Sequence, residues 1–165
     1  MKEYKASMGL TVRIITICVV VLFVGLSCNS VFQLINSNFN WHQIIIHSST
    51  LLPFIGLLLL SYVLAPYKYI VEDDTLIICR PISNVHIPVG SINQIRLIEK
   101  AEMKGLIRTF GNGGLFGIYG KFYSKALGSV TSYATQNKNY ILVLAGKRKF
   151  VLTPNDLELV AEIKK

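Results

Sequence analysis

Charged residues are missing from two long stretches of this 165-residue chain, although the whole chain carries a net charge of +8. Residues 14–35 and 44–65 contain no Asp, Glu, Lys or Arg, and they are rich in Leu, Ile, Val and Phe. About 20 apolar residues in a helix are enough to cross a hydrocarbon core of ~30 Å. Only residues 36–43 separate the two stretches, so the sequence predicts a helical hairpin that spans a membrane twice.

Cysteine is also scarce, and its spacing shows no metal or redox motif. Cys18 and Cys28 lie in the first apolar stretch, and Cys79 lies far beyond both stretches. The chain has no CxxC pair, and its three histidines are not at the spacings of zinc ligands. We therefore expect no metal site, no cofactor and no required disulfide.

Catalytic motifs are equally absent. The glycine-rich segment 111–117 resembles a phosphate-binding loop, but a dinucleotide fingerprint would need glycine at Phe116 and a helix afterwards. Bends and bulges between strands explain these glycines without a ligand. No serine after residue 65 lies in a Gly-x-Ser-x-Gly setting, and His86, the one histidine there, fits the surface of a strand. We predict that the protein is not an enzyme, with a lipid- or nucleotide-acting enzyme as a remote alternative.

The charges that flank the two apolar stretches predict their orientation. Lys2, Lys5 and Arg13 precede the first stretch. Lys68 follows the second, whereas segment 36–43 has neither Lys nor Arg. Because positive charge is retained in the cytoplasm, both termini are expected there.

A cleaved lipoprotein signal is the competing interpretation of the first stretch. Gly25-Leu26-Ser27-Cys28 faintly resembles a lipoprotein cleavage box, but Gly25 stands where Leu is usual. The apolar run also continues past Cys28 to Ile35. A permanent span is therefore favoured.

The composition changes at Pro66, and the remaining 100 residues carry fourteen Lys or Arg and eight Asp or Glu. Short β-rich runs separated by turn residues predict about seven or eight strands there. The nine candidate runs for these strands are 67–71, 75–80, 84–89, 92–99, 106–110, 119–123, 130–135, 140–144 and 149–152. Thr153 and Pro154 predict the start of a C-terminal helix. The pattern is typical of an antiparallel sandwich or partly open barrel with one helix across an end.

A series of glycine and aromatic motifs lies within this region: RTFGNGGLFG at 108–117, YGKF at 119–122, LG at 127–128, YAT at 133–135, GK at 146–147 and FVLTPND at 150–156. In this order, the series resembles the bacterial pleckstrin-homology-like (PH-like) family of membrane-tethered domains. The resemblance covers residues 67–165 and implies a seven-stranded bent barrel capped by a C-terminal helix. It implies no established activity, because fold alone does not fix function. We expect three parts: a cytoplasmic flank (1–13), a transmembrane hairpin (14–65) and a cytoplasmic PH-like domain (66–165) at a bacterial inner membrane.

Basic residues are the best functional clue in the domain. Eight of them gather near predicted turns and strand ends: Lys100, Lys104, Arg108, Lys121, Lys125, Lys147, Arg148 and Lys149. The resemblance suggests that such loops contact anionic lipid headgroups, and the competing interpretation is a basic, solvated surface. Nucleic acid is not an expected partner, because no recognition-helix pattern accompanies the charge.

These observations predict a non-catalytic module for protein or lipid interactions at the cytoplasmic membrane face. A protein partner or a homo-oligomer is compatible with this prediction. The alternative is an accessory subunit of a larger membrane complex. In that case the polar patch Ser27–Ser30 of the first stretch would be the docking seam.

Overall fold

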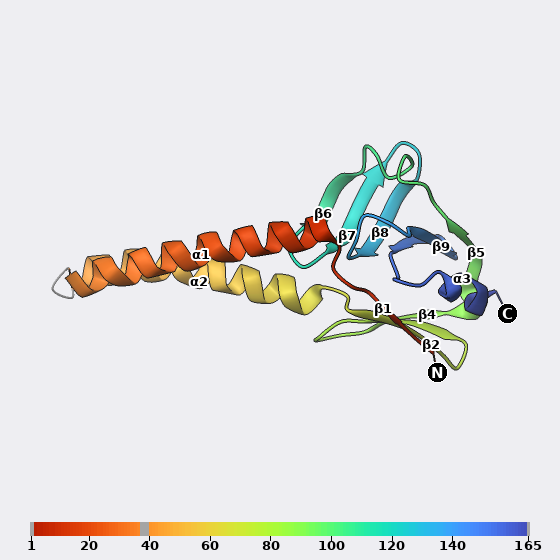
Figure 1. The fold of residues 1–165 in the computed structure, drawn as a ribbon, viewed down its shortest axis with the longest axis horizontal. Coiled ribbons are helices and arrows are strands. Elements are labelled where there is room, and N and C mark those ends of the chain that lie inside the picture. Colours follow the sequence, from red (N-terminus) through yellow and green to blue (C-terminus); the bar gives the residue numbers. More distant parts are fainter. Residues whose placement is uncertain (1, 37–39, 165) are drawn as a thin grey trace.

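The computed structural model of the protein describes residues 2–36 and 40–164. Two long helices, α1 (Leu10–Asn36) and α2 (Trp41–Leu64), lie side by side and project from a β-rich domain (Figure 1). They match the two predicted apolar stretches to within four residues at every end. Within the predicted connecting segment, residues 37–39 lie outside the described residues, and α2 already begins at Trp41.

Side-chain contacts along the two helices follow from the sequence. The Asn40 side chain caps α2 by accepting a hydrogen bond from the His42 backbone amide at 3.3 Å. Further along, the rings of Phe23 and Phe54 meet with centroids 4.7 Å apart. Most other large apolar side chains of both helices are exposed on the surface of the helix pair.

The first sheet has four antiparallel strands in the order β1-β2-β3-β4. They are β1 (Lys2–Lys5), β2 (Lys68–Glu72), β3 (Thr75–Cys79) and β4 (Val85–Pro88). Strand β1 precedes the helical hairpin, whereas the other three strands follow it. The N-terminal end of the chain is therefore part of the domain's sheet (Figure 1).

Nothing in residues 1–13 predicts β1, because its four residues show a single apolar position between charges. That position, Tyr4, lies opposite Tyr69 and is buried in the core. Two ion pairs hold the strand in place: Lys2 with Glu162 at 2.7 Å, and Glu3 with Lys68 at 2.8 Å. The segment after β1 is also tied down, since the Gly9 amide donates to the carbonyl of Thr135 at 2.8 Å.

The second sheet has six strands in the order β5-β9-β10-β8-β7-β6. They are β5 (Ile92–Leu97), β6 (Ile107–Gly113), β7 (Ile118–Ser124), β8 (Gly128–Ala134), β9 (Ile141–Ala145) and β10 (Arg148–Leu152), and the 3-10 turn η1 (Val89–Ser91) precedes them. The expected hairpin at residues 145–148 is confirmed by the β9–β10 pairing. One pair departs from the expected antiparallel pattern, because β8 and β10 run parallel.

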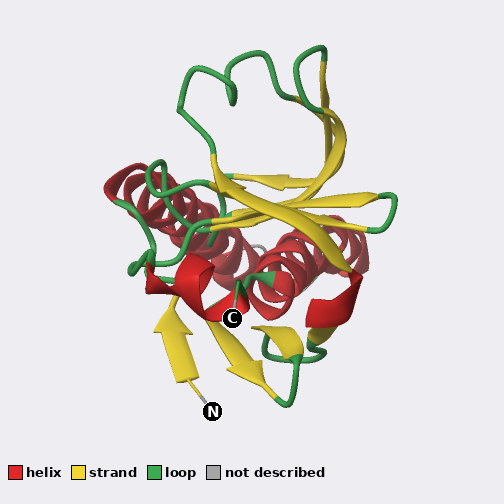
Figure 2. Ribbon diagram, turned by 90° about the vertical axis from the view of Figure 1, so that its right-hand side faces the viewer, coloured by secondary structure: helices red, strands yellow, loops and turns green. Residues whose placement is uncertain are grey.

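The two sheets face each other across the main core (Figure 2). Tyr69, Leu76 and Ile78 from the first sheet and Ile141 and Leu152 from the second are fully buried there. A second core lies within the larger sheet and the loop that follows β5. The β-rich domain and its short C-terminal helix are as expected, while the ladders of the described residues do not close into one barrel.

The predicted start of the C-terminal helix is wrong. Helix α3 (Glu158–Ile163) begins five residues after Thr153. Thr153 is instead fully buried, and its hydroxyl accepts a hydrogen bond from the Thr135 amide at 2.8 Å. Because that oxygen joins the end of β10 to the end of β8, it does not cap a helix. The Asp156 carboxylate serves the helix start by accepting from the Glu158 amide at 2.9 Å.

Candidate functional site

A basic hollow lies where the β9–β10 hairpin meets β4, β7 and β8. Its volume is about 510 Å³, and none of the residues that line it is acidic. The lining residues are Val85, His86, Lys121, Ser129, Thr131, Tyr133, Lys147, Arg148, Lys149 and Phe150. Four of the eight predicted basic residues therefore meet in one place. We call this site the basic hollow.

Strand register explains why residues far apart in the sequence meet at the basic hollow. Lys121 on β7 lies opposite Thr131 on β8, and Thr131 lies opposite Phe150 on β10. Successive side chains of a strand point to opposite faces, so Arg148 shares the face of Phe150 and Lys121. The opposite face of these strands packs into the second core.

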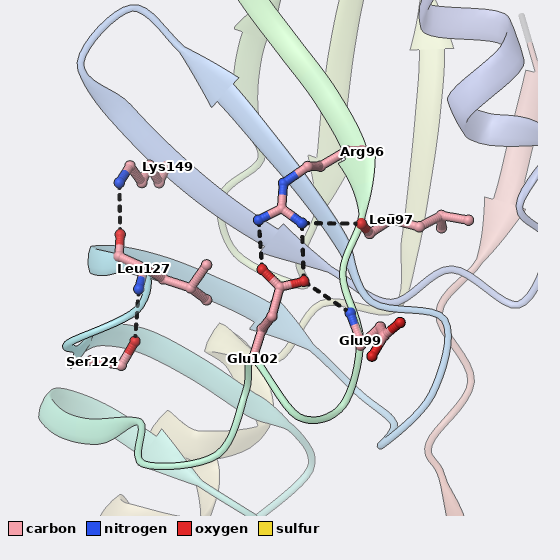
Figure 3. Close-up of polar contacts among 7 residues, drawn as sticks. All are labelled: Arg96, Leu97, Glu99, Glu102, Ser124, Leu127 and Lys149. Carbon is pink, nitrogen blue, oxygen red and sulfur yellow. Dashed lines mark hydrogen bonds and ion pairs between the residues drawn. The ribbon is translucent and has the colours of Figure 1, made fainter.

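The charges of the basic hollow are mostly uncompensated within the protein. The side chains of Lys121, Lys147 and Arg148 make no hydrogen bond or ion pair with any residue of ranges 2–36 and 40–164. Lys149 differs, because its Nζ donates to the carbonyl of Leu127 at 2.7 Å, as Figure 3 shows. The charge of Lys149 therefore stabilises the turn between β7 and β8, and the other three are free for a ligand.

A second polar arrangement lies where the domain meets the helices, and Asn112 of β6 is its centre. Its side-chain nitrogen donates to the hydroxyls of Ser61 on α2 and of Tyr119, both at 3.1 Å. Its side-chain oxygen accepts from the amides of Gly114 and Leu115 at 3.1 and 3.0 Å. One amide thus fixes the glycine-rich segment and attaches it to α2. We call this contact region the junction.

Both helices take part in the junction. The Tyr119 hydroxyl donates to the backbone carbonyl of Ser61 on α2 at 2.5 Å, and burial raises the pKa of Tyr119. On α1, the Thr16 hydroxyl accepts from the Phe116 amide at 2.9 Å. The ring of Phe116 meets that of Tyr62 edge-on, with centroids 5.5 Å apart. The glycine-rich segment 111–117 is therefore a docking loop for the two helices.

Glycine is required at two positions beside the junction. Gly111 and Gly120 lie opposite each other on β6 and β7, with φ of 125° and 117°. A Cβ on either residue would lie 2.3 Å from a backbone carbonyl oxygen of the facing strand. This confirms that these two glycines have structural reasons to be there, with no phosphate needed to explain them.

The comparisons with known proteins identify the β-rich part of the chain. A family model described as "Bacterial PH domain" matches residues 67–165, more than half of the chain. The chain belongs to the bacterial PH domain family. No curated protein and no solved structure matches it. The family favours a non-catalytic interaction module, and the basic hollow and the junction both involve this PH domain.

The other four predicted basic residues lie elsewhere in the PH domain. Lys100 and Lys104 are on the loop between β5 and β6, and Lys125 follows β7 in the turn to β8. Arg108 is on β6 near the junction. The eight residues therefore do not form one continuous site, and only the hairpin group and Lys121 share the basic hollow.

An ion pair orders the loop that carries Lys100 and Lys104 (Figure 3). The Arg96 guanidinium donates two hydrogen bonds to the Glu102 carboxylate, at 3.0 and 2.6 Å. The Glu99 amide donates to the same carboxylate at 3.2 Å. The Arg96 hydrogen bond is the main cause that lowers the pKa of Glu102. This loop has its own internal counter-charge, unlike the basic hollow.

Sequence reasoning missed the polar residues of the junction, and it placed His86 only on a strand surface. In the part of the chain that the structure describes, no three His, Cys, Asp or Glu residues lie together as candidate metal ligands. Asn112 had a detectable signal, because it is the one amide side chain inside the glycine-rich string. Ser61 and Thr16 had none, since isolated hydroxyls are common in apolar helices.

Proposed function

We propose that the protein is a membrane-anchored interaction module that binds anionic lipid headgroups through the basic hollow of its PH domain. In this proposal α1 and α2 span a bacterial inner membrane, and both termini and the PH domain lie in the cytoplasm. The observation that carries the proposal is the cluster of three unpaired cations in a hollow lined by no acid. The three positive charges repel one another, and a bound anion would relieve this repulsion. The basic hollow therefore favours a negatively charged ligand.

Helix length supports the membrane anchor. The 27 residues of α1 and the 24 of α2 span about 40 and 36 Å, against a hydrocarbon core of ~30 Å. Their apolar windows have mean hydropathies of 2.5 and 2.0, with only 11% and 6% of the residues buried. The excess length is at the domain end, where Thr16 and Ser61 contact the junction. These two residues mark the expected boundary of the hydrocarbon.

The pairing of β1 with β2 supports a hairpin topology. β1 precedes α1 and β2 follows α2, yet the two strands are hydrogen-bonded neighbours. Both ends of the hairpin must therefore lie on the same side of any membrane that it spans. The basic flanks favour the cytoplasmic side.

The headgroup proposal can be tested with the full-length protein in neutral detergent micelles. We expect dihexanoyl phosphatidylglycerol to bind in a calorimetric titration, and dihexanoyl phosphatidylcholine to bind much more weakly. Combining Lys121→Gln with Arg148→Gln should remove the preference for the anionic lipid. Combining Lys100→Gln with Lys104→Gln removes the same charge from the solvent-exposed loop and should leave it intact. Equal binding of the two lipids by the unaltered protein would contradict the proposal.

The topology can be tested by cysteine labelling in a background without Cys18, Cys28 and Cys79. A cysteine at Asn40 should react with an impermeant reagent added outside spheroplasts. One at Lys138 should react only after the cells are opened. External labelling at position 138 would show that the PH domain lies outside the cytoplasm, and it would contradict the proposed topology.

The accessory-subunit alternative has its own supporting observation. Asn29 and Gln33 lie on an exposed face of α1. Among the described residues, their side chains are hydrogen-bonded only to each other, at 3.4 Å. Polar side chains in a span favour a neighbouring helix over lipid. Stable co-purification of another membrane protein, lost on Asn29→Leu and kept on Cys18→Leu, would favour this alternative.

A further inference from the structure

An apolar groove runs along the junction between the helix pair and β6. Its volume is about 440 Å³, within the range of ~300–1,000 Å³ that is typical of ligand pockets. Val19 from α1 and Leu57 and Leu60 from α2 line one side, and Arg108 and Phe110 from β6 line the other. This junction groove is separate from the basic hollow and shares none of its residues.

The junction groove crosses the expected boundary of the hydrocarbon. Val19 is three residues beyond Thr16 on α1, and Leu57 is four residues beyond Ser61 on α2, so both lie ~5 Å deeper in the membrane. Arg108 lies at the other side of the groove, on the domain. One end of the groove is therefore apolar at acyl-chain depth, and the other carries a positive charge at headgroup depth.

Two features of β6 favour ligand binding at Arg108 and at the apolar surface beside it. The Arg108 side chain is exposed and makes no hydrogen bond or ion pair with any residue that the structure describes. Phe110 and Ile107 leave 77% and 67% of their surface uncovered, although both lie on a strand beside the membrane helices. A bulge between Arg108 and Phe110 shifts the register here, and bulges often redirect side chains at functional edges.

We propose that the junction groove holds one phospholipid of the surrounding membrane. Its phosphate accepts hydrogen bonds from the Arg108 guanidinium, and an acyl chain lies against Val19, Leu57 and Phe110. A guanidinium can donate two parallel hydrogen bonds to one phosphate, so Arg108 alone is sufficient to bind a headgroup at the groove. The proposal rests on the proposed membrane insertion of both helices, and it does not depend on the basic hollow. A bound lipid would join the PH domain to the bilayer as a third attachment beside the two helices.

Photo-crosslinking of the full-length protein in nanodiscs tests the proposal. The discs contain phosphatidylcholine and phosphatidylglycerol at 4:1, with a small fraction of phosphatidylglycerol that carries a diazirine on one acyl chain. Mass spectrometry after illumination should find adducts concentrated around Leu57, Leu60 and Phe110, above the level on other lipid-facing positions. Arg108→Gln should lower the groove adducts about tenfold, because a charge-assisted hydrogen bond to the phosphate is lost.

Matched variants separate this proposal from the others. Arg148→Gln removes the same charge from the basic hollow and should leave the groove adducts unchanged. Phe110→Ser should lower the adducts on β6 but leave those on the distant part of α1 unchanged. Both replaced side chains are exposed, so the variants are expected to fold, and circular dichroism checks this.

The outcomes are distinguishable. If no residue of α1 or α2 is labelled, membrane insertion itself fails. If both helices are labelled evenly along their length and the groove shows no enrichment, insertion holds and the lipid site is wrong. An Arg108→Gln variant with unchanged groove adducts would also overturn the lipid site. Disulfide-linked dimers of a Phe110→Cys variant, in place of lipid adducts, would show that a second copy occupies the groove.

Discussion

The junction and the basic hollow both involve the PH domain, but they differ in whether their polar side chains have hydrogen-bond partners. At the junction, Asn112 makes four hydrogen bonds, and Thr16 and Tyr119 are also bonded. In the basic hollow, the charged side chains of Lys121 and Arg148 have no hydrogen-bond or ion-pair partner among the described residues. Satisfied polar groups hold a structure together, because breaking them leaves buried donors without partners. Unpaired charges contribute little to the fold and are available for binding.

This difference means that mutations in the two regions should have separable effects. Changes at the junction should lower the free energy of unfolding of the domain or loosen its attachment to the helices. Changes in the basic hollow should alter ligand binding and leave the fold intact. Four experiments, ordered by the size of the expected effect, test this separation.

The largest effect is expected at the glycine pair beside the junction. Gly111→Val places a Cβ 2.3 Å from the carbonyl oxygen of Tyr119, at a φ of 125°. We expect a loss of more than ~3 kcal/mol in the free energy of unfolding. Denaturant titration in detergent, followed by circular dichroism, measures it. Gly105→Val is the control, because its φ is 77° with no atom within 4 Å of the added Cβ. Equal losses would show that the facing strand is not the cause.

Asn112→Ala should have the next largest effect. It leaves the amides of Gly114 and Leu115 without their acceptor, and we expect a loss of about 2–3 kcal/mol. Limited proteolysis should also cut the glycine-rich segment faster. Asn93→Ala removes an exposed side chain of the same type, and its unfolding curve should match that of the unaltered protein. A stable Asn112→Ala protein would mean that the junction does not hold the loop.

The junction should weaken in alkali. Burial raises the pKa of Tyr119, so the folded form keeps its proton at a pH where the unfolded tyrosine, with a pKa near ~10, has lost it. The contribution to stability is full below pH ~10 and falls above it, by at most ~1.4 kcal/mol per pH unit until the folded pKa is reached. Unfolding titrations from pH 9 to 11 should show this decline, and Tyr119→Phe should reduce it. The same slope in both proteins would assign the decline to other groups.

The smallest effect on stability is expected in the basic hollow. Lys121→Gln combined with Arg148→Gln should change the free energy of unfolding by less than ~0.5 kcal/mol. The anionic lipid headgroup should stabilise the unaltered protein, by about 1.4 kcal/mol at ten times its dissociation constant, and should not stabilise the variant. Melting temperatures with and without dihexanoyl phosphatidylglycerol measure both quantities. A strongly destabilised variant would show that these charges are part of the fold after all.

Local patterns predicted the helices, most of the strands and the β9–β10 hairpin, because each depends on residues close in sequence. Strand β1 was missed, since its only apolar residue gains burial from a strand that lies more than 60 residues away. The parallel pairing of β8 with β10 was missed for the same reason: β9 lies between them in the chain and on the far side of β10 in the sheet. The helix start was wrongly predicted at Thr153, because a hydroxyl before a proline is typical of a helix start. In the fold, the Thr153 hydroxyl instead connects the ends of two strands.

The candidate sites were predictable only in part. The basic residues stood out by type, but strand register decides which of them meet, and register is not visible in their spacing. Register brings Lys121 and Arg148 together at the basic hollow, whereas Arg108 lies opposite Phe122 and lines the junction groove. The junction depends on contacts between an apolar helix and a loop about 50 to 100 residues later. Such contacts leave no mark on local composition.

The position of β1 has a consequence for the order in which the protein is made. β1 leaves the ribosome before the two helices, and its partner β2 follows only after both helices have been synthesised. At 5–20 residues per second the delay is on the order of 3–12 s. During that time Tyr4 has no sheet to join, and afterwards it can reach β2 only if the chain has returned to the side on which it began. If the hairpin spans the membrane as proposed, completion of the sheet depends on its correct insertion, and a wrongly inserted chain would expose the edge of β2 to the cell's proteases.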